Sequence, residues 1–150
     1  MKARLVYQTL DERRNFTRDG DPAAAMDVGQ RAMIKKWLDT MGVEGYTVND
    51  DMTVDVAGTV HIGGKSLREF PSYVRFGEVR GNFFCGFNGL TSLRGCPKRV
   101  SGDFSCSRNP LASLEGCPEA VGGSFYCYVT GFAAKDIIKL CKVDGNIFGA

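Results

Sequence analysis

Apolar residues recur through the middle of the chain with a period of 21 residues. Three segments carry the pattern, beginning at Val79, Val100 and Val121, and the first reads V-R-G-N-F-F-C-G-F-N-G-L-T-S-L-R-G-C-P. Each segment opens with apolar residues at every second position, which predicts a strand that buries one face. A short period that keeps the same apolar positions indicates a stack of like units, each burying its inner side against the next.

The aligned copies separate into columns with different structural roles. The columns expected to point inward are Phe83, Phe104 and Phe125; Cys85, Cys106 and Cys127; Leu90, Leu111 and Phe132; and Leu93 with Leu114. Asn88 and Asn109 stand where the chain must turn, so their amides are expected to hydrogen-bond the open backbone of the neighbouring turn. A tail of the form L-x-x-L-x-G-C-P closes the first two units. Its glycine, Gly95 or Gly116, allows a positive φ, and its proline ends any helix.

A degenerate copy precedes these three. It begins at Val56, reaches Pro71, and is 23 residues long because its return loop carries two extra residues. A near-constant period returns the chain to the same place one coil later, so the strands of successive copies should form one parallel sheet in sequential order. These strands are expected to start near Gly58, Gly81, Gly102 and Gly123.

The segment before the repeats is predicted to cover the first open edge of the stack. A helix is expected from about Gln30 to Met41, with Asp27 as its N-cap and Gly42 as its C-terminal stop. Its core-facing side is expected to carry Met33, Ile34, Trp37, Leu38 and Met41.

A hairpin and a second helix complete the predicted caps. Residues 46–48 and 53–56 read as strands around an Asn-Asp-Asp turn, whose turn chemistry explains the acidic pair without a metal or catalytic role. After the repeats, residues 134–141 read as a short helix and residues 147–148 as a final strand. The helix is expected to protect the last edge of the stack by turning these side chains inward: Ile137, Ile138, Leu140 and Cys141.

Together these elements predict an α+β fold, a short parallel β-solenoid capped by an N-terminal helix and hairpin and by a C-terminal helix. A chain of 150 residues buries about two-thirds of its unfolded surface, enough for one core. We therefore expect one domain over residues 1–150, with an N-terminal cap at 1–55, the solenoid at 56–132 and a C-terminal cap at 133–150. The sequence predicts least about residues 1–26. The first ten residues could form a strand, and the side chain of Phe16 is expected to pack into the domain.

The repeats resemble the leucine-rich-repeat consensus L-x-L-x-x-N-x-L. The residues at its positions are Phe83, Cys85, Asn88 and Leu90. They look most like the short, cysteine- and glycine-rich variant found in small proteins of tailed bacteriophages. Stretches 34–56 and 132–148 are similar to the flanks of such proteins, so about residues 21–148 are covered. The asparagine is replaced in the end copies by Lys65 and Thr130, as expected where stacking stops. The resemblance implies a leucine-rich-repeat-like solenoid, but a fold alone implies no activity.

The charge of the chain leaves the class of partner open. The formal net charge is +2, and residues 1–50 contain eight basic and eight acidic side chains without a polybasic arm. No stretch approaches the ~20 apolar residues of a membrane span, and the first ten residues are too polar for a signal peptide. The expected location is the cytoplasm, which for a phage-encoded protein is that of the bacterial host.

Six cysteines raise the alternatives of disulfides or a zinc site. Zinc ligands come in pairs two to four residues apart, whereas the closest cysteines here are ten or eleven residues apart, and His61 is the single histidine. Stacked coils would bring Cys85 and Cys106 about 4.8 Å apart, but side chains in register point the same way, which disfavours a disulfide torsion. The favoured interpretation is a ladder of reduced, buried thiols, with no metal and no cofactor.

Recognition is expected on the outward side of the strands, where residues vary while the scaffold stays constant. The candidate partner-binding residues are His61, Asn82, Phe84, Asp103, Ser105, Tyr126 and Tyr128. Phe84, Tyr126 and Tyr128 matter most, because exposed aromatic residues with small polar neighbours are typical anchors of protein interfaces. The alternative is that a cap folds over this face and buries them.

The function we predict is that of a non-enzymatic protein-binding module that engages a bacterial host or defence protein, with inhibition as one outcome. The host partner follows from the resemblance alone. An enzyme is disfavoured, because His61 has no nucleophile or carboxylate at a motif spacing and the chain has no phosphate-binding loop motif. The alternatives are a virion-associated structural protein and a nucleic-acid-binding accessory protein. The latter would use a basic patch of Arg80, Arg94, Lys98, Arg99 and Arg108.

Overall fold

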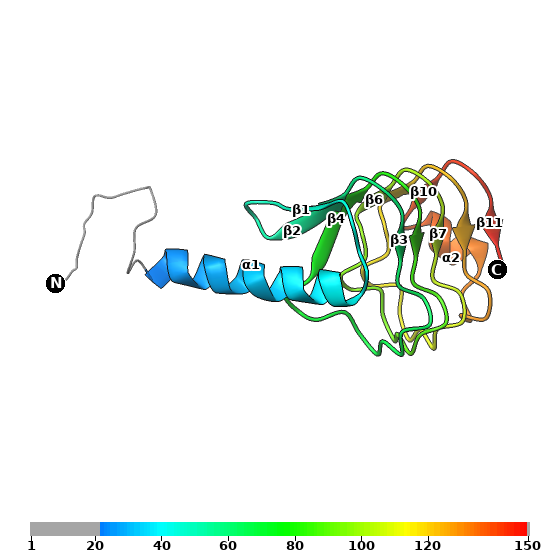
Figure 1. Cartoon of the computed structure of the whole chain (residues 1–150). Coiled ribbons are helices and arrows are strands. Elements are labelled where there is room, and N and C mark those ends of the chain that lie inside the picture. Colours follow the sequence, from blue (N-terminus) through cyan, green and yellow to red (C-terminus); the bar gives the residue numbers. More distant parts are fainter. Residues whose placement is uncertain (1–21, 150) are drawn as a thin grey trace. The chain divides into compact units, whose positions relative to one another are not determined.

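The computed structural model describes residues 22–149, which form a β-solenoid with two helices (Figure 1). In chain order the elements are α1 (Pro22–Thr40), β1 (Tyr46–Val48), β2 (Thr53–Val56), β3 (Val60–His61), β4 (Arg75–Val79), β5 (Phe83–Phe84), β6 (Arg99–Val100), β7 (Phe104–Ser105), β8 (Ala120–Val121), β9 (Phe125–Tyr126), α2 (Ala134–Ile138), β10 (Lys142–Val143) and β11 (Ile147–Phe148). Each turn adds one short strand to each of two sheets, and the chain completes about four turns.

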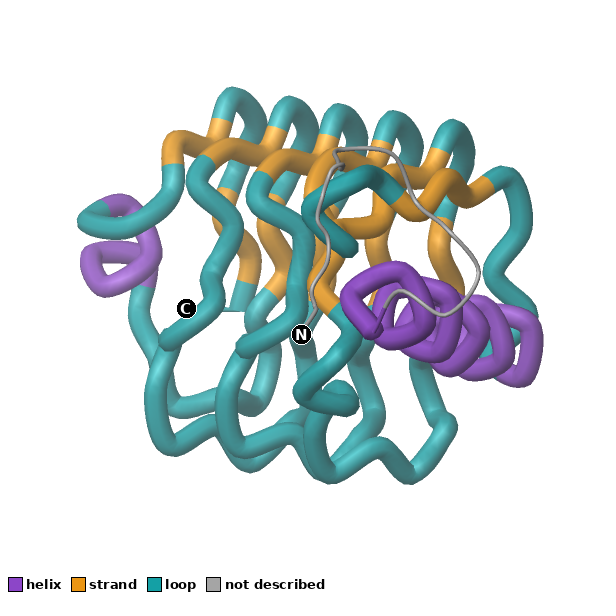
Figure 2. The backbone as a smooth tube through the Cα atoms, turned by 90° about the vertical axis from the view of Figure 1, so that its left-hand side faces the viewer, coloured by secondary structure: helices purple, strands orange, loops and turns teal. Residues whose placement is uncertain are grey.

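The strands form two rows along the stack, joined by turns (Figure 2). Sheet A has the order β1-β2-β4-β6-β8-β10, and sheet B has the order β11-β9-β7-β5-β3. Neighbouring strands are parallel, except that β1 and β2 form an antiparallel hairpin with the predicted bounds. The predicted parallel and sequential stacking is confirmed in sheet B, whereas the sequence analysis predicts no second parallel sheet.

A bend between the sheets divides each predicted strand. The alternation from Val79 to Cys85 predicts one strand, but the chain turns at Gly81, so that Val79 ends β4 in sheet A and Phe83 begins β5 in sheet B. Neighbouring coils approach closely at this bend: a Cβ on Gly81 would lie 2.7 Å from the backbone carbon of Gly58. Any other residue there would push the coils apart, and this is why the repeat keeps a glycine.

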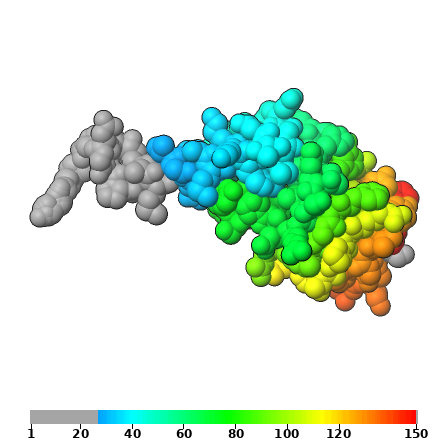
Figure 3. Space-filling model, turned by 60° about the horizontal axis from the view of Figure 1, so that its bottom comes forward, coloured from blue at the N-terminus to red at the C-terminus, as the bar shows by residue number. Residues whose placement is uncertain are grey.

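The inward columns form continuous ladders inside the solenoid. The rings of Phe83, Phe104 and Phe125 are fully buried, with centroids 5.9 and 4.9 Å apart between successive coils. A second fully buried ladder is formed by Cys85, Cys106 and Cys127. Burial of each phenylalanine contributes about 2–3 kcal/mol. In the space-filling view, successive coils lie against one another as contiguous bands from green to orange (Figure 3).

Asn88 and Asn109 join consecutive coils through their side-chain amides, as predicted. Oδ1 of Asn109 accepts hydrogen bonds from the backbone N–H groups of Asn88 and Leu90, and its Nδ2 donates to a backbone carbonyl in each of the two coils. Asn88 makes equivalent bonds to the coil before it. Thr130, in the same column, hydrogen-bonds within its own coil instead.

Contacts within the chain separate it into two units, residues 1–32 and 33–150, and the solenoid belongs to the second. α1 begins at Pro22, earlier than predicted, so Asp27 lies inside the helix and is not its cap. No helix within residues 22–149 has the length and apolar character needed to cross a membrane. The predicted domain boundaries stay a prediction, and both Phe16 and the strand expected in the first ten residues lie outside the described part of the chain.

The end of α1 follows the sequence prediction with one exception. Gly42 adopts a φ of +79°, which confirms it as the C-terminal stop. Ile34 and Leu38 are fully buried, whereas Met33 is half exposed because it lies beside the buried stripe and not on it. The half-buried members of that stripe are Trp37 and Met41.

The C-terminal segment continues the stack beyond the predicted repeats. β11 confirms the predicted final strand, and β10 and β11 together extend both sheets by another coil. The order V-x-G-x-apolar-aromatic, from Val143 to Phe148, matches the order from Val121 to Tyr126. This match is the sequence signal for the additional coil.

α2 buries fewer side chains than predicted. Ile137 and Cys141 are buried, but Ile138 and Leu140 are 63% and 53% exposed. Ile138 follows the buried Ile137 by one helical position, about 100° around the axis, and so faces away from the core. The helix ends there, so Leu140 does not keep the helical spacing on which the prediction depends. Two large apolar side chains therefore face outward at this end of the solenoid.

Candidate functional site

The outer face of sheet B carries one row of side chains, with a member from every strand. The parallel register places His61 beside Phe84, followed by Ser105, Tyr126 and Phe148. The structure thus brings four of the predicted site residues into one row. It adds Phe148, which the sequence analysis did not align with the repeats.

The rings of this row form two close pairs, the first tilted by 34° and the second stacked at 19°, with Ser105 between the pairs. The ring centroids of His61 and Phe84 are 5.1 Å apart, as are those of Tyr126 and Phe148. Ser105 separates the pairs, and because neighbouring parallel strands lie about 4.8 Å apart, the bases of Phe84 and Tyr126 are roughly 9.6 Å apart. That width corresponds to two ring-stacking distances.

A second row follows the strands of sheet B at the next turn. It consists of Gly64, Phe87, Arg108 and Val129. Phe87, Arg108 and Val129 have φ values of 56°, 58° and 55°. This left-handed backbone costs about 1–2 kcal/mol for each L-residue, and it is rarest for β-branched residues such as valine. Glycine would adopt it without strain, as Gly64 does.

The strained row is also exposed. Phe87 and Val129 are 66% and 67% exposed, and the guanidinium of Arg108 lies 5.4 Å from the ring centroid of Phe87. Tyr128, next to Val129, is 47% exposed and its ring lies 6.4 Å from that of Tyr126. We call the aromatic face the set His61, Phe84, Phe87, Tyr126, Tyr128 and Phe148. Phe87 and Val129 were not among the predicted site residues, although the glycine in their column is a signal for a left-handed position.

Two of the predicted site residues, Asn82 and Asp103, serve the scaffold at the bend between the sheets. Oδ1 of Asn82 accepts a hydrogen bond from the N–H of Asp103, and Oδ1 of Asp103 accepts one from the N–H of Ser124, both at 2.8 Å. These bonds connect each coil to the next. The acceptor oxygens are thus already engaged at the border of the aromatic face.

The cations of the predicted basic patch are spread over different parts of the solenoid. Arg108 stacks on Phe87 beside the aromatic face. Arg80 forms an ion pair with Glu78, with Nη2 and Oε1 3.6 Å apart, and Arg99 lies in register with Glu78 in sheet A. Arg80 and Arg99 therefore both lie beside Glu78 in sheet A, apart from Arg108.

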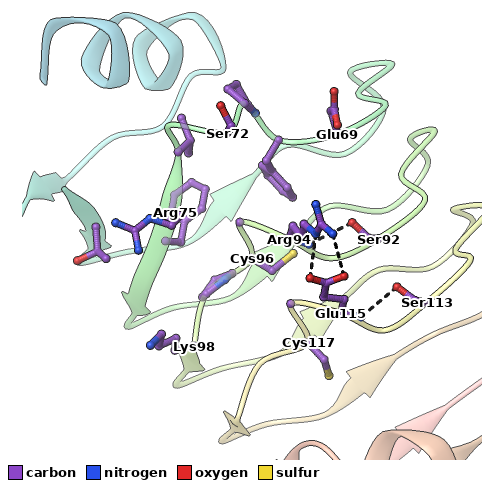
Figure 4. Close-up of a pocket in the computed structure, with 18 of the residues that line it drawn as sticks. Glu69, Ser72, Arg75, Ser92, Arg94, Cys96, Lys98, Ser113, Glu115 and Cys117 are labelled. Carbon is purple, nitrogen blue, oxygen red and sulfur yellow. Dashed lines mark hydrogen bonds and ion pairs between the residues drawn. The ribbon is translucent and has the colours of Figure 1, made fainter. Parts of the chain in front are cut away.

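Arg94 and Lys98 line a groove of about 930 Å³ beside the return segments (Figure 4). Arg94 pairs with Glu115 through two contacts, Nη2 to Oε1 at 3.1 Å and Nε to Oε2 at 3.0 Å, and this pairing raises the pKa of Arg94. Both side chains are well exposed, so solvent screens the pair and it contributes little to stability. Phe70 and Cys96 lie among the apolar lining. The mixed charge of the groove gives it no preference for a polyanion.

The buried thiols of the Cys85, Cys106 and Cys127 ladder are part of the core and are poorly suited to chemistry. Burial raises the pKa of Cys106, and Sγ of Cys85 donates to a backbone carbonyl 3.3 Å away. A hydrogen bond between Cys117 and Cys141 raises the pKa of the first and lowers that of the second. A protonated, buried thiol is a weak nucleophile and a weak ligand. Among the described residues, no three or more His, Cys, Asp or Glu side chains cluster in a way that could hold a metal ion.

Comparison with known protein families, with curated proteins and with solved structures finds no match to this chain. Its function has to be inferred from the geometry of the aromatic face and of the rows around it.

Proposed function

We propose that this protein is a non-enzymatic binding module whose protein partner docks on the aromatic face of sheet B. The observation that carries the proposal is the exposure of Phe87, Tyr128 and Phe148 around the half-buried rings of Phe84 and Tyr126. Aromatic side chains that combine a large contact area with few rotatable bonds are the usual energetic centres of protein interfaces. Ser105 provides the gap into which one planar side chain of the partner inserts.

The backbone strain beside this face supports the same proposal. Phe87, Arg108 and Val129 occupy positions at which glycine would be more stable. Because their side chains are exposed, they make few packing contacts that could offset this strain in the monomer. Strained residues of this kind cluster at sites of recognition, where the side chain itself is needed.

The class of partner rests on the resemblance of the repeats and not on the aromatic face. We propose that the repeats are a leucine-rich-repeat-like variant, which the asparagine bonds between coils support. We further propose that the protein is phage-encoded, acts in the cytoplasm of the bacterial host, and engages a host or defence protein there, with inhibition as one outcome. Neither a cofactor nor a catalytic role is part of this proposal.

Affinity capture tests the aromatic face directly. The tagged full chain is incubated with bacterial lysate, and bound proteins are identified by mass spectrometry. The wild type is expected to recover one host protein, and the variant with Phe84, Tyr126 and Tyr128 all changed to Ser is expected to lose it, because each aromatic anchor is worth about 2 kcal/mol or more in binding. The melting temperature should stay within a few degrees.

A matched charge variant separates this proposal from nucleic-acid binding. Changing Arg94, Lys98 and Arg99 to Glu should leave the captured protein unchanged. Recovery of nucleic acid that salt releases, and its loss in the charge variant, would favour the nucleic-acid alternative. Sedimentation with intact virions would favour the structural one. A folded aromatic variant that still captures the host protein would show that the aromatic face is not the site.

A further inference from the structure

The last described coil leaves one strand edge unpaired in each sheet. Within residues 22–149, β10 is hydrogen-bonded only to β8, and β11 only to β9. A row of unpaired backbone N–H and C=O groups is a template for a further strand. The residues of β10 determine which strand fits.

The backbone of β10 offers a matched donor and acceptor at Val143. The N–H of Lys142 donates to the carbonyl of Glu119, and the N–H of Asp144 donates to that of Val121, both at 2.9 Å, so these two residues face β8. Successive residues of a strand direct their backbone groups to opposite edges, so the N–H and C=O of Val143 point away from β8. One donor and one acceptor on the same residue are what an antiparallel partner strand needs for a hydrogen-bonded pair.

The charges on either side of Val143 are opposite in sign. Lys142 and Asp144 are both exposed. Asp144 follows β10 directly and still bonds to β8 through its N–H, so the strand geometry extends to it and both side chains project from the same face of the sheet. In an antiparallel pair centred on Val143 of two copies, Lys142 of each copy lies opposite Asp144 of the other, with Cβ atoms about 4.5–5.5 Å apart. The edge is therefore complementary to itself in charge and in hydrogen bonding.

The exposed apolar side chains at this end agree with the same arrangement. α2 lies on the side of the return segments, and β11 lies in sheet B (Figure 2). A twofold axis through Val143 and perpendicular to sheet A exchanges these two sides, so that α2 of one copy faces β11 of the other. Ile138 and Leu140, which are 63% and 53% exposed, would then lie against the free edge of β11.

We propose that this chain forms a twofold dimer through β10, in which two copies of the six-stranded sheet A join into one continuous sheet. A second copy fits better than an unrelated strand because the edge matches itself in backbone register, in charge and in apolar surface. The dimer does not depend on the proposed function. Each assembly would present two aromatic faces.

Charge reversal in β10 tests the pairing, with sedimentation equilibrium of the full chain as the measurement. The wild type is expected to dimerise. Lys142→Asp places two carboxylates opposite each other, and Asp144→Lys does the same with two ammonium groups, so each variant alone should dimerise at least about tenfold more weakly. An equimolar mixture of the two variants should recover a heterodimer, and the double variant Lys142→Asp, Asp144→Lys should dimerise as the wild type does.

The outcomes separate this proposal from other forms of association. A wild type that stays monomeric at every concentration overturns it. Single variants that dimerise normally, or a mixture that fails to recover the dimer, also overturn it, because another surface would then be in use. If a charge variant fails to fold, as judged by circular dichroism, the variant Ile138→Asp with Leu140→Asp is measured instead. Both side chains are exposed in the monomer, so this variant should fold and should dimerise more weakly than the wild type. Normal dimerisation of this variant would overturn the proposal. Capture of a host protein by folded monomeric variants would keep the proposed function independent of the dimer.

Discussion

The inner and outer rows of sheet B occupy neighbouring positions on the same strands but differ in kind. On β5, β7 and β9 the inner residue is always phenylalanine and is fully buried. The outer residue, one position later, is Phe84, Ser105 or Tyr126 and is partly exposed. The ring of Phe104 packs against Phe83 and Phe125 in the coils on both sides, so a change there disturbs two contacts. Regularity along the repeat therefore marks packing, and irregularity marks surface that is available for recognition.

Shortening one side chain of each row on the same strand, β7, tests this division most directly. Phe104→Ala should lower the free energy of unfolding by about 3–5 kcal/mol, because it leaves a cavity between two rings that the coils on either side cannot close. Ser105→Ala, the adjacent outer change, should alter it by no more than about 0.5 kcal/mol. Urea denaturation of the two variants measures both. Equal effects would contradict the division into packing and surface rows.

The thiol ladder should behave as the inner row does. Cys106→Ser should destabilise the fold by about 1–3 kcal/mol, because it buries a hydroxyl whose nearest acceptor, the carbonyl of Tyr126, lies 3.8 Å from the present sulfur. A thiol reagent should label Cys85, Cys106 and Cys127 slowly in the native protein and quickly in urea. Fast native labelling of all three would show that they are not core.

Alkaline pH should weaken the fold through the same residue. Burial holds the pKa of Cys106 well above the ordinary value of about 8.5, so the folded state keeps a proton that the unfolded chain releases. Its contribution to the free energy of unfolding is complete below about pH 8.5 and decreases as pH rises above it. Cys106→Ala should make this decrease shallower when urea titrations at pH 7 and pH 10 are compared.

A change in the strained row should have effects of opposite sign on stability and on binding. Phe87→Gly relieves the positive φ and should raise the free energy of unfolding by up to about 1 kcal/mol. The same change removes an exposed aromatic residue and should reduce capture of the partner. Calorimetry and capture are measured on one preparation. A variant that is less stable yet binds normally would assign Phe87 to the scaffold.

Filling the gap in the outer row should have the smallest effect on stability. Ser105→Phe would place a ring between Phe84 and Tyr126 and stabilise the fold by about 0.5 kcal/mol through aromatic stacking. Capture of the partner should fall, because the planar site is then occupied by the protein itself. Ser105→Ala serves as the control, since it leaves the gap open. Unchanged capture by the Phe variant would place the partner elsewhere on the aromatic face.

The inner ladders and the asparagine bonds could be predicted from the sequence because packing repeats with the period. The second sheet could not, because the alternation from Val79 to Cys85 continues through the bend at Gly81 and reads as one strand. In the sequence, a close approach of two backbones is marked only by a glycine. The additional coil at Val143 was missed because its signal is a single short match, without the asparagine and proline that mark the earlier copies.

The candidate site was less predictable than the fold. The row of His61, Phe84 and Tyr126 follows from strand alternation, and the structure bears out that placement. Phe87 and Val129 lie after the strand, where alternation gives no direction for a side chain. Arg108 lies over the ring of Phe87, which belongs to the preceding coil. The positions of the basic residues in the sequence do not predict this contact.

The asparagine bonds also bear on how the solenoid opens. Asn88 and Asn109 each hold the coil before them, whereas Thr130 bonds only within its own coil. Because each coil in a stack is stabilised mainly by its nearest neighbours, loss of one such link weakens the cooperativity of the coils beyond it. In the monomer, amide hydrogen exchange should then be slowest around Leu90 and fastest beyond Thr130. The part of the aromatic face that contains Phe148 lies in the coil that unfolds most readily. A ligand bound there would therefore stabilise this coil against local unfolding.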